Sequence, residues 1–200
     1  MNRNRTWSPP APAAPVSDDY LESVTVGERK PHNDRIRLEA YDPDWAAQYA
    51  QAAVRIRSGL GGKVLLLEHV GSTSVPGLAA KPIIDMVLAV AASEDEDAYV
   101  PELERAGFSL RAREPDWFAH RFFHARSGRM AFNLHVFSSD CEEIDRMLAF
   151  RDRLRSTPAD RQRYEDVKRE LAARTWKHVQ NYADAKSDIV REILAACCPH

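Results

Sequence analysis

The chain has few cysteines, and their placement argues against a disulfide or zinc framework. Its 200 residues include three cysteines, Cys141, Cys197 and Cys198. An odd count without metal-ligand spacing does not indicate a metal site. Adjacent cysteines such as Cys197 and Cys198 pair poorly with each other, so a reducing compartment is favoured.

The chain also lacks an excess of charge of either sign and any long apolar run. Its formal net charge is −2, whereas binding to a phosphate backbone needs a clear basic excess. We therefore expect no dedicated nucleic-acid binding. No apolar run approaches the roughly 20 residues that cross a bilayer, and the N-terminus has no apolar signal-peptide core. A cytoplasmic protein with no membrane partner is expected, and its oligomeric state stays open.

The composition is that of one globular domain that follows a proline-rich N-terminal tail. Hydrophobic residues make up 44% and charged residues 29% of the chain, which is enough for an ordinary core. Residues 1–15 hold four of the twelve prolines and cannot pack regularly. We predict a disordered tail over 1–33 and one domain over 34–198. A protein-binding role of the tail is the less favoured alternative.

Hydrophobic periodicity and turn signals predict an α/β (α+β) fold. Strands are expected at 35–40, 64–69, 83–90, 108–111, 120–125 and 130–137. Helices are expected after Asp42-Pro43 to about 58, from Ser93 to about 107, from Ser139 to about 155, from Thr157 onward, and over 182–196. The prediction is a mixed β-sheet of five or six strands packed with helices, plus a helical C-terminal lobe.

The stretch from His69 to Val90 carries the strongest functional signal. An apolar strand leads through His69 to the turn Gly71-Ser72, and the next apolar strand carries one acid, Asp85. Turn N–H groups and a hydroxyl suit a phosphate, and a carboxylate on the next strand suits a phosphate-bound magnesium ion. The alternative for Gly71-Ser72 is a tight turn that uses the conformational freedom of glycine.

Neighbouring residues extend this predicted site, each with a structural alternative. Lys81 offers a charge for phosphate or is a solvated strand end. Thr73 and Ser74 add hydroxyl donors or cap the following turn. Asp85 lies among apolar residues, where a carboxylate costs free energy unless it is paired, protonated or metal-bound. A buried ion pair of Asp85 with Lys81 or an arginine is the alternative to a site.

Two histidines, His69 and His135, could join Asp85. His135 shares a strand face with Asn133 because alternate residues point to the same side. A His-Asp-His set could hold a divalent metal such as manganese or zinc. His135 could instead act as a general base or be a core histidine with satisfied hydrogen bonds.

Two more cationic residues are candidates for phosphate binding from other segments. Arg121, on a neighbouring predicted strand, offers a guanidinium fork. Tyr182 and Lys186 are spaced i, i+4 on one side of a predicted helix, from which they could reach the same cleft.

The motif resembles the GrpB family, a branch of the nucleotidyltransferase superfamily. The superfamily pattern is an apolar residue, Gly, Gly or Ser, a short spacer, and Asp-apolar-Asp/Glu. Gly71, Ser72 and Asp85 match this pattern, whereas Val87 stands at the place of the second acid. The resemblance spans residues 35–196, and its further matches are Tyr41-Asp42-Pro43-Asp44-Trp45, Asn133-Leu134-His135-Val136-Phe137, Phe150-Arg151-Asp152-Arg153-Leu154-Arg155, Tyr164, Lys168, Tyr182 and Lys186.

The resemblance implies a nucleotidyltransferase that uses ATP or another nucleoside triphosphate with Mg²⁺ or Mn²⁺. A small-molecule acceptor is implied, and a carboxylate activated for amide formation is one candidate. The implied catalytic residues are Asp85 and His135, and the implied metal ligands are Asp85, His69 and His135. The implied phosphate- or nucleotide-binding residues are Gly71, Ser72, Thr73, Ser74, Lys81, Arg121 and Lys186.

The missing acid keeps an alternative function open. Two-metal mechanisms share carboxylates between the ions, so Val87 favours a non-catalytic nucleotide- or coenzyme A-related accessory module. GrpB-like domains also occur fused to dephospho-coenzyme A kinase, which fits that alternative. A protein-modifying role in a toxin–antitoxin pair is a third, weaker hypothesis.

Overall fold

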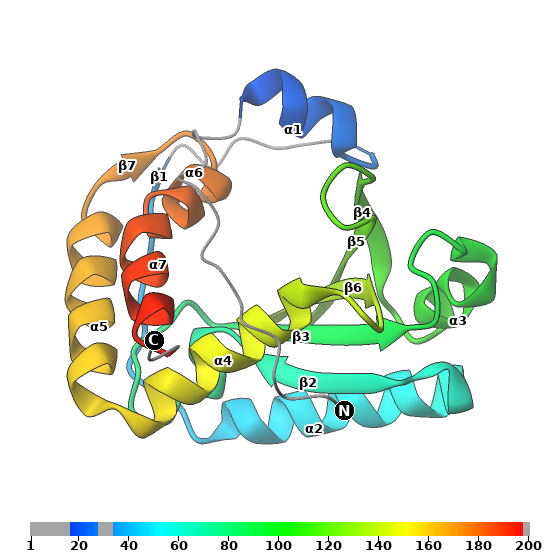
Figure 1. The fold of residues 1–200 in the computed structure, drawn as a ribbon, viewed down its shortest axis with the longest axis horizontal. Helices are drawn as coiled ribbons and strands as arrows, with labels where there is room; N and C mark the ends of the chain where they lie inside the picture. Colours follow the sequence, from blue (N-terminus) through cyan, green and yellow to red (C-terminus); the bar gives the residue numbers. More distant parts are fainter. Residues whose placement is uncertain (1–16, 28–33, 198–200) are drawn as a thin grey trace.

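The centre of the protein is a five-stranded mixed sheet. The computed structural model describes residues 17–27 and 34–197 (Figure 1). The strands are β2 (Leu66–Val70), β3 (Ile83–Val90), β4 (Ser109–Glu114), β5 (His120–Ser127) and β6 (Met130–Ser138), in the order β2-β3-β6-β5-β4. β3 and β6 run parallel and the other pairs antiparallel. The predicted mixed sheet packed with helices is confirmed.

Helix α2 (Asp44–Leu60) covers one face of this sheet and runs along β2 in Figure 1. It begins where the Asp42 carboxylate accepts the N–H of Asp44 at 2.9 Å, which satisfies an otherwise free helix donor. It ends at Gly61, whose φ of +54° favours glycine. Its buried face, including Ile56, packs against Met86 of β3 in the main core.

The C-terminal lobe consists of four helices gathered beside the sheet (Figure 1). They are α4 (Glu142–Ser156), α5 (Pro158–Ala172), α6 (Val179–Asp184) and α7 (Ser187–Ala195). Buried residues of α4, α5 and α7 pack on Val75 and Leu78 of the loop between β2 and β3. Where the sequence predicted one helix over 182–196, the structure has two, α6 and α7. Lys186 lies in the break between them. This packing fixes the lobe next to the Gly-Ser turn.

A short two-stranded sheet and a short helix complete the fold. β1 (Asp34–Arg35) pairs antiparallel with β7 (Thr175–Trp176). Where a helix was predicted from Ser93, the chain forms a 3-10 turn at Glu96–Ala98 and then α3 (Val100–Arg105). No helix in 17–27 or 34–197 is long and apolar enough to cross a membrane.

A helix also forms inside the segment predicted as a disordered tail. α1 (Asp18–Val24) is capped by the Ser17 hydroxyl, which accepts the N–H of Tyr20 at 3.1 Å. After it, the N–H of Val26 donates to the carbonyl of Arg111 at 2.7 Å. For 17–27 the disorder prediction is therefore wrong, because the cap and the pairing with β4 satisfy the backbone. The rest of the predicted tail, 1–16 and 28–33, lies outside the described residues.

The alternation of β3 divides its side chains between two environments. Ile84, Met86 and Leu88 belong to the core under α2. Val87 and Ala89 belong to the cluster under α4, with Ile144. Because alternate residues share a face, Asp85 points to the α4 side. The register of β2 and β6 with β3 determines which residues lie beside Asp85.

The central strand β6 should carry much of the stability of the fold. Leu134 is fully buried, so Leu134→Ala should lower the free energy of unfolding by about 2–5 kcal/mol through lost burial and a cavity. Leu65→Ala is the matched control, because Leu65 is 52% exposed and should change stability by at most about 0.5 kcal/mol. Urea denaturation of both variants measures this, and equal losses would contradict the packing of β6.

Candidate functional site

The sheet face opposite α2 is the floor of a cleft with a volume of about 1400 Å³. The sheet contributes Asp85, Asn133 and His135 to its lining, and the helical lobe contributes Lys168 and Lys186. Residues of α1 also line it, and in Figure 1 α1 and α6 lie on the same side of β3. The cleft therefore lies between the sheet, the lobe and α1.

The Gly71 backbone turns directly against the Asp85 carboxylate. Val70 pairs with Asp85 across β2 and β3, and Gly71 follows with a φ of +67°. A Cβ at position 71 would lie 2.5 Å from Oδ2 of Asp85, so a side chain there would clash. Glycine is needed here both for its backbone conformation and for the close approach.

Asp85 is held by a row of polar side chains across three strands. Its Oδ1 accepts a hydrogen bond from Nδ2 of Asn133 at 2.8 Å. Oδ1 of Asn133 lies 3.2 Å from Nδ1 of His124. Burial raises the pKa of Asp85, while the Asn133 hydrogen bond and the nearby lysines act in the opposite direction. The alternative of a simple ion pair with Lys81 or an arginine therefore does not describe this carboxylate, whose hydrogen-bond partner is Asn133.

The three hydroxyls of the loop have different roles. Ser72 Oγ accepts a hydrogen bond from Nζ of Lys168 at 2.8 Å. Thr73 Oγ1 donates to the carbonyl of Ile83 at 3.0 Å, and Ser74 Oγ donates to the carbonyl of Gly71 at 2.6 Å. Thr73 and Ser74 thus stabilise the turn, which was their structural alternative, and Ser72 is the loop hydroxyl in contact with a site lysine.

Two of the site lysines flank the ring of Tyr182. Nζ of Lys186 lies 4.5 Å and Nζ of Lys81 lies 5.4 Å from the ring centroid, within the range of cation–π attraction. Both lysines line the cleft. The sequence predicted both as phosphate ligands, and the structure brings them together although they are far apart in the chain.

A third lysine, Lys168 of α5, was not predicted as a site residue. It is 2% exposed, and Nζ donates to Ser72 Oγ at 2.8 Å and to the carbonyl of Ala79 at 2.5 Å. Nζ also lies 5.3 Å from the centroid of Tyr164, one helical turn earlier. The i, i+4 spacing of Tyr164 and Lys168 was the available signal, but it resembles that of any amphipathic helix.

The lysines share an environment that disfavours their charge. Burial lowers the pKa of Lys168 to about 7 and the pKa values of Lys81 and Lys186 to about 8. The nearby charge of Lys186 lowers the pKa of both Lys81 and Lys168, and the Asp85 carboxylate raises the pKa of all three lysines. Glu165 also raises the pKa of Lys168 and Asp184 that of Lys186, yet burial keeps all three pKa values low. An anionic ligand beside the lysines would favour their charged forms.

His69 does not join Asp85. It pairs with Met86 across β2 and β3, so its side chain lies on the α2 face. There its ring stacks on Tyr49 with a centroid distance of 4.8 Å, Nε2 lies 3.0 Å from Oγ1 of Thr73, and burial lowers its pKa to about 4. Its prediction as a metal ligand beside Asp85 is wrong because the sheet separates the two side chains.

No group of three or more His, Cys, Asp or Glu side chains in the described part of the chain is arranged to hold a metal. The predicted His69, Asp85 and His135 set is therefore not assembled. Val87 is fully buried under α4. Of the predicted set, Asp85 is the carboxylate that lines the cleft. That donor fits a magnesium ion that arrives with nucleotide phosphates, because such ions need only one or two protein carboxylates.

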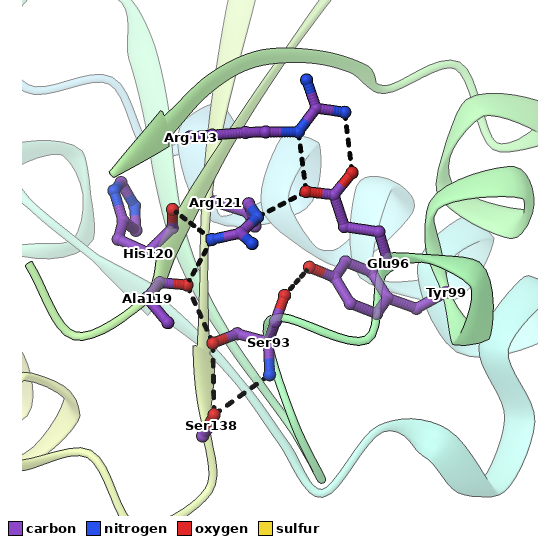
Figure 2. Close-up of polar contacts among 8 residues, drawn as sticks. All are labelled: Ser93, Glu96, Tyr99, Arg113, Ala119, His120, Arg121 and Ser138. Carbon is purple, nitrogen blue, oxygen red and sulfur yellow. Dashed lines mark hydrogen bonds and ion pairs between the residues drawn. The ribbon is translucent and has the colours of Figure 1, made fainter. Parts of the chain in front are cut away.

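Arg121 also lies on the opposite face of the sheet. It pairs with Val136 across β5 and β6 and is 8% exposed. Figure 2 shows its guanidinium between Glu96 and the carbonyl of Ala119. Nε donates to Glu96 at 2.6 Å and Nη1 to Ala119 at 2.9 Å. The phosphate role predicted for Arg121 does not fit this position, because its guanidinium is already hydrogen-bonded on the sheet face opposite the cleft.

This buried network holds a strained turn at the edge of the cleft. Phe118 and Ala119 have φ values of +54° and +49°, a left-handed conformation that costs about 1–2 kcal/mol per residue. Ser93, predicted as a helix cap, is instead fully buried. Its hydroxyl donates to the carbonyl of Ala119 at 2.9 Å, and its N–H donates to Ser138 Oγ at 3.0 Å (Figure 2). Ser93 and Arg121 thus bind the same carbonyl and fix the turn.

His135 lies on the cleft floor, on the same sheet face as Asp85. It pairs with Val87 across β3 and β6, and Nδ1 lies 3.1 Å from Nε2 of His120. Burial, together with His120, lowers the pKa of His135 to about 3. His120 was missed in the sequence, although the alternation of 120, 122 and 124 places His120, Phe122 and His124 on one face.

The mixed sheet, the Gly-Ser turn and the acid on the following strand define a nucleotidyltransferase-like α/β protein. Residues 35–196 match the family model described as GrpB protein. The chain belongs to the GrpB family.

Known relatives and a solved structure agree with this assignment. A UPF0157 protein of Halalkalibacterium halodurans is 57% identical over 91% of this chain and 92% of its own length. The crystal structure of the conserved protein GrpB from Enterococcus faecalis is similar with a TM-score of 0.67 and 31% identity, over 80% of this chain and 98% of that one. A dephospho-CoA kinase of Mycolicibacterium paratuberculosis is 28% identical over 78% of this chain, which matches 44% of that protein.

The contact between Gly71 and Asp85 can be tested by adding one methyl group. Gly71→Ala should lower the free energy of unfolding by about 1–3 kcal/mol more than Gly77→Ala. Both glycines have positive φ, but a Cβ at Gly77 meets no atom within 4 Å. Chemical denaturation measures the difference, and equal losses would show that the Asp85 carboxylate moves aside without cost.

The low pKa of Lys168 predicts a pH dependence of stability. The folded value is about 7, against an ordinary value of 10.5. Between these values the unfolded chain binds more protons than the folded protein, so the free energy of unfolding rises with pH. One proton contributes at most about 1.4 kcal/mol per pH unit. Lys168→Met should reduce the slope measured by urea denaturation between about pH 7.5 and about pH 9.

The matched control for this slope is Lys63→Met. The Lys63 side chain is 48% exposed, so this variant should keep the slope of the unchanged protein. Lys81 and Lys186 remain in both variants and contribute slopes of the same sign. A Lys168→Met protein with an unaltered slope would show that Lys168 keeps an ordinary pKa.

Proposed function

We propose that the cleft binds a nucleoside triphosphate, ATP first, and that the protein transfers its nucleotidyl group to a small-molecule acceptor. The observation that carries the proposal is the cluster of three buried lysines, Lys81, Lys168 and Lys186, near Asp85, the carboxylate that acts on all three. Buried cations are costly without counter-charge, and a triphosphate supplies that charge. Family membership supports the same class of ligand.

The binding part of the proposal assigns a role to each cationic group. The three ammonium groups would offset the triphosphate charge, and Ser72 Oγ, already fixed by Lys168, would donate to a phosphate oxygen. Bound phosphate would raise the lowered lysine pKa values, so binding would take up protons near neutral pH. Asp85 would hold a Mg²⁺ or Mn²⁺ ion that arrives with the nucleotide, and that ion would offset phosphate charge.

The transfer part of the proposal assigns the acceptor to the floor beside His135. Phosphoryl-group chemistry depends mainly on positioning and on charge stabilisation, and the lysines and Asp85 would supply both. His135 shares the cleft face with Asp85 and is neutral near pH 7 because its pKa is low. A neutral imidazole can accept the proton of an attacking hydroxyl. Because a pKa of about 3 makes His135 a weak base by itself, it needs a second group that takes the proton onward.

A second candidate is a non-catalytic module that binds a coenzyme A-related nucleotide. Two observations favour it: Val87 takes the place of a second metal carboxylate, and two relatives are named dephospho-CoA kinase. Its ligand also carries phosphates, so the lysine cluster serves both candidates. The two differ in whether a bond to the α-phosphate is broken.

Ligand-induced stabilisation tests the binding site. Millimolar ATP with Mg²⁺ should raise the Tm of the protein, since a ligand at 100 times its Kd adds about 2.7 kcal/mol. Lys186→Met should lose most of this shift, whereas Lys177→Met, at a side chain 63% exposed, should keep it. Absence of any shift with nucleoside triphosphates, coenzyme A or dephospho-coenzyme A would exclude the phosphate site.

The same samples separate transfer from binding alone. With ATP labelled at the α-phosphate, Mg²⁺ and a mixture of small carboxylates and alcohols, a transferase should form a labelled product and release pyrophosphate. A binding module should show the Tm shift without either. Label transferred from the γ-phosphate instead would contradict nucleotidyl transfer.

A further inference from the structure

We propose that Glu114, His120 and His135 form a proton relay that presents the unprotonated Nε2 of His135 to the acceptor. In this relay His135 is the catalytic base, and Glu114 and His120 are positioning residues that act through it. The inference rests on the proposed function for the identity of the acceptor site. The relay itself rests on the hydrogen bonds between these three side chains.

The hydrogen bonds determine which nitrogen carries each proton. Oε2 of Glu114 lies 2.7 Å from Nδ1 of His120, and an ionised carboxylate only accepts, so Nδ1 of His120 donates. Nε2 of His120 is then the acceptor for Nδ1 of His135, 3.1 Å away. Nε2 of His135 is left with a lone pair, and among the described residues it has no hydrogen-bond partner.

The carboxylate end of the relay is fixed by α1. The hydroxyl of Tyr20 donates to Oε1 of Glu114 at 3.3 Å, so each carboxylate oxygen has one donor. Helix α4 contributes three charged residues to the cleft lining: Glu142, Glu143 and Arg146. Glu143 is paired with Arg146 through two hydrogen bonds. Glu114 is the carboxylate hydrogen-bonded to His120.

The middle of the relay is held by packing and by the network behind the sheet. The His120 ring is 2% exposed and lies 4.8 Å from the Trp117 centroid and 4.7 Å from that of Phe137. On the other face, Arg121 donates to the carbonyl of His120 at 3.3 Å (Figure 2). Backbone and ring are thus held from opposite sides, which keeps Nε2 of His120 directed at His135.

The proposed step transfers one proton to His135 and a second proton from His135 to His120. Nε2 of His135 takes the proton from the acceptor O–H, and the O–H electron pair stays on the attacking oxygen. Nδ1 of His135 passes its proton to Nε2 of His120. The positive charge then lies on His120, beside the Glu114 carboxylate, and His135 is neutral again. No other reactant is needed.

Nitrogen-15 NMR of the protein without ligand tests the relay directly. Protonated and unprotonated imidazole nitrogens give well-separated signals. Near pH 7 we expect His120 and His135 both to carry their proton on Nδ1. In Glu114→Met the acceptor for His120 Nδ1 is lost, so both rings should shift to the Nε2-protonated form. A wild-type His135 that carries its proton on Nε2 would overturn the proposal.

Two further variants keep the test specific. Glu114→Gln retains an acceptor oxygen and should retain the wild-type tautomers, and Glu142→Gln, at another acid lining the cleft, should also leave them unchanged. A Glu114→Met protein that is folded by its amide spectrum and keeps the wild-type tautomers would also overturn the relay. Because no nucleotide is present, a failure of the ATP–Mg²⁺ Tm shift would count against the proposed function and would leave the tautomer result intact.

Discussion

The candidate site depends on the backbone pairing of β3 with both of its neighbours. Pairing with β2 places Val70 opposite Asp85, so the chain leaves β2 at Gly71 directly over the carboxylate. Pairing with β6 places Asn133 opposite Asp85 and His135 opposite Val87. A slip of one residue in either pair would turn these side chains to the other face. The buried apolar residues of β3 on the α2 side hold this register.

Burial of the lysine cluster lowers the stability of the protein at the site where we propose that an anionic ligand binds. Lys168 is 2% exposed yet carries an ammonium group whose partners are a hydroxyl and a carbonyl oxygen. Sites that violate the usual rules of burial are often functional. Lys81 and Lys186 add to the same positive potential. The lysine cluster forms where the helical lobe packs on the Gly-Ser turn.

The two faces of β5 have complementary roles. His120 faces the cleft and contacts His135 and Glu114. Arg121, the next residue, faces the core and binds Glu96 and the carbonyl of Ala119. The strained turn at Phe118 and Ala119 persists because surrounding contacts hold it. Arg121 lies on the face away from the cleft, and its hydrogen bond to the carbonyl of His120 helps to fix the position of that cleft histidine.

The sequence by itself determined the mixed α/β class, the Gly71-Ser72 turn and the acid at Asp85, because these depend on local pattern and on neighbours in the chain. It also showed the missing acid at Val87. Only the tertiary structure decided that His69 and Arg121 lie on the wrong face for the site. A strand pattern shows that residues alternate, but the register with neighbouring strands decides which face is the cleft. Lys168 joins Ser72 across 96 residues of sequence, and contacts of that range arise from packing, which no local pattern determines.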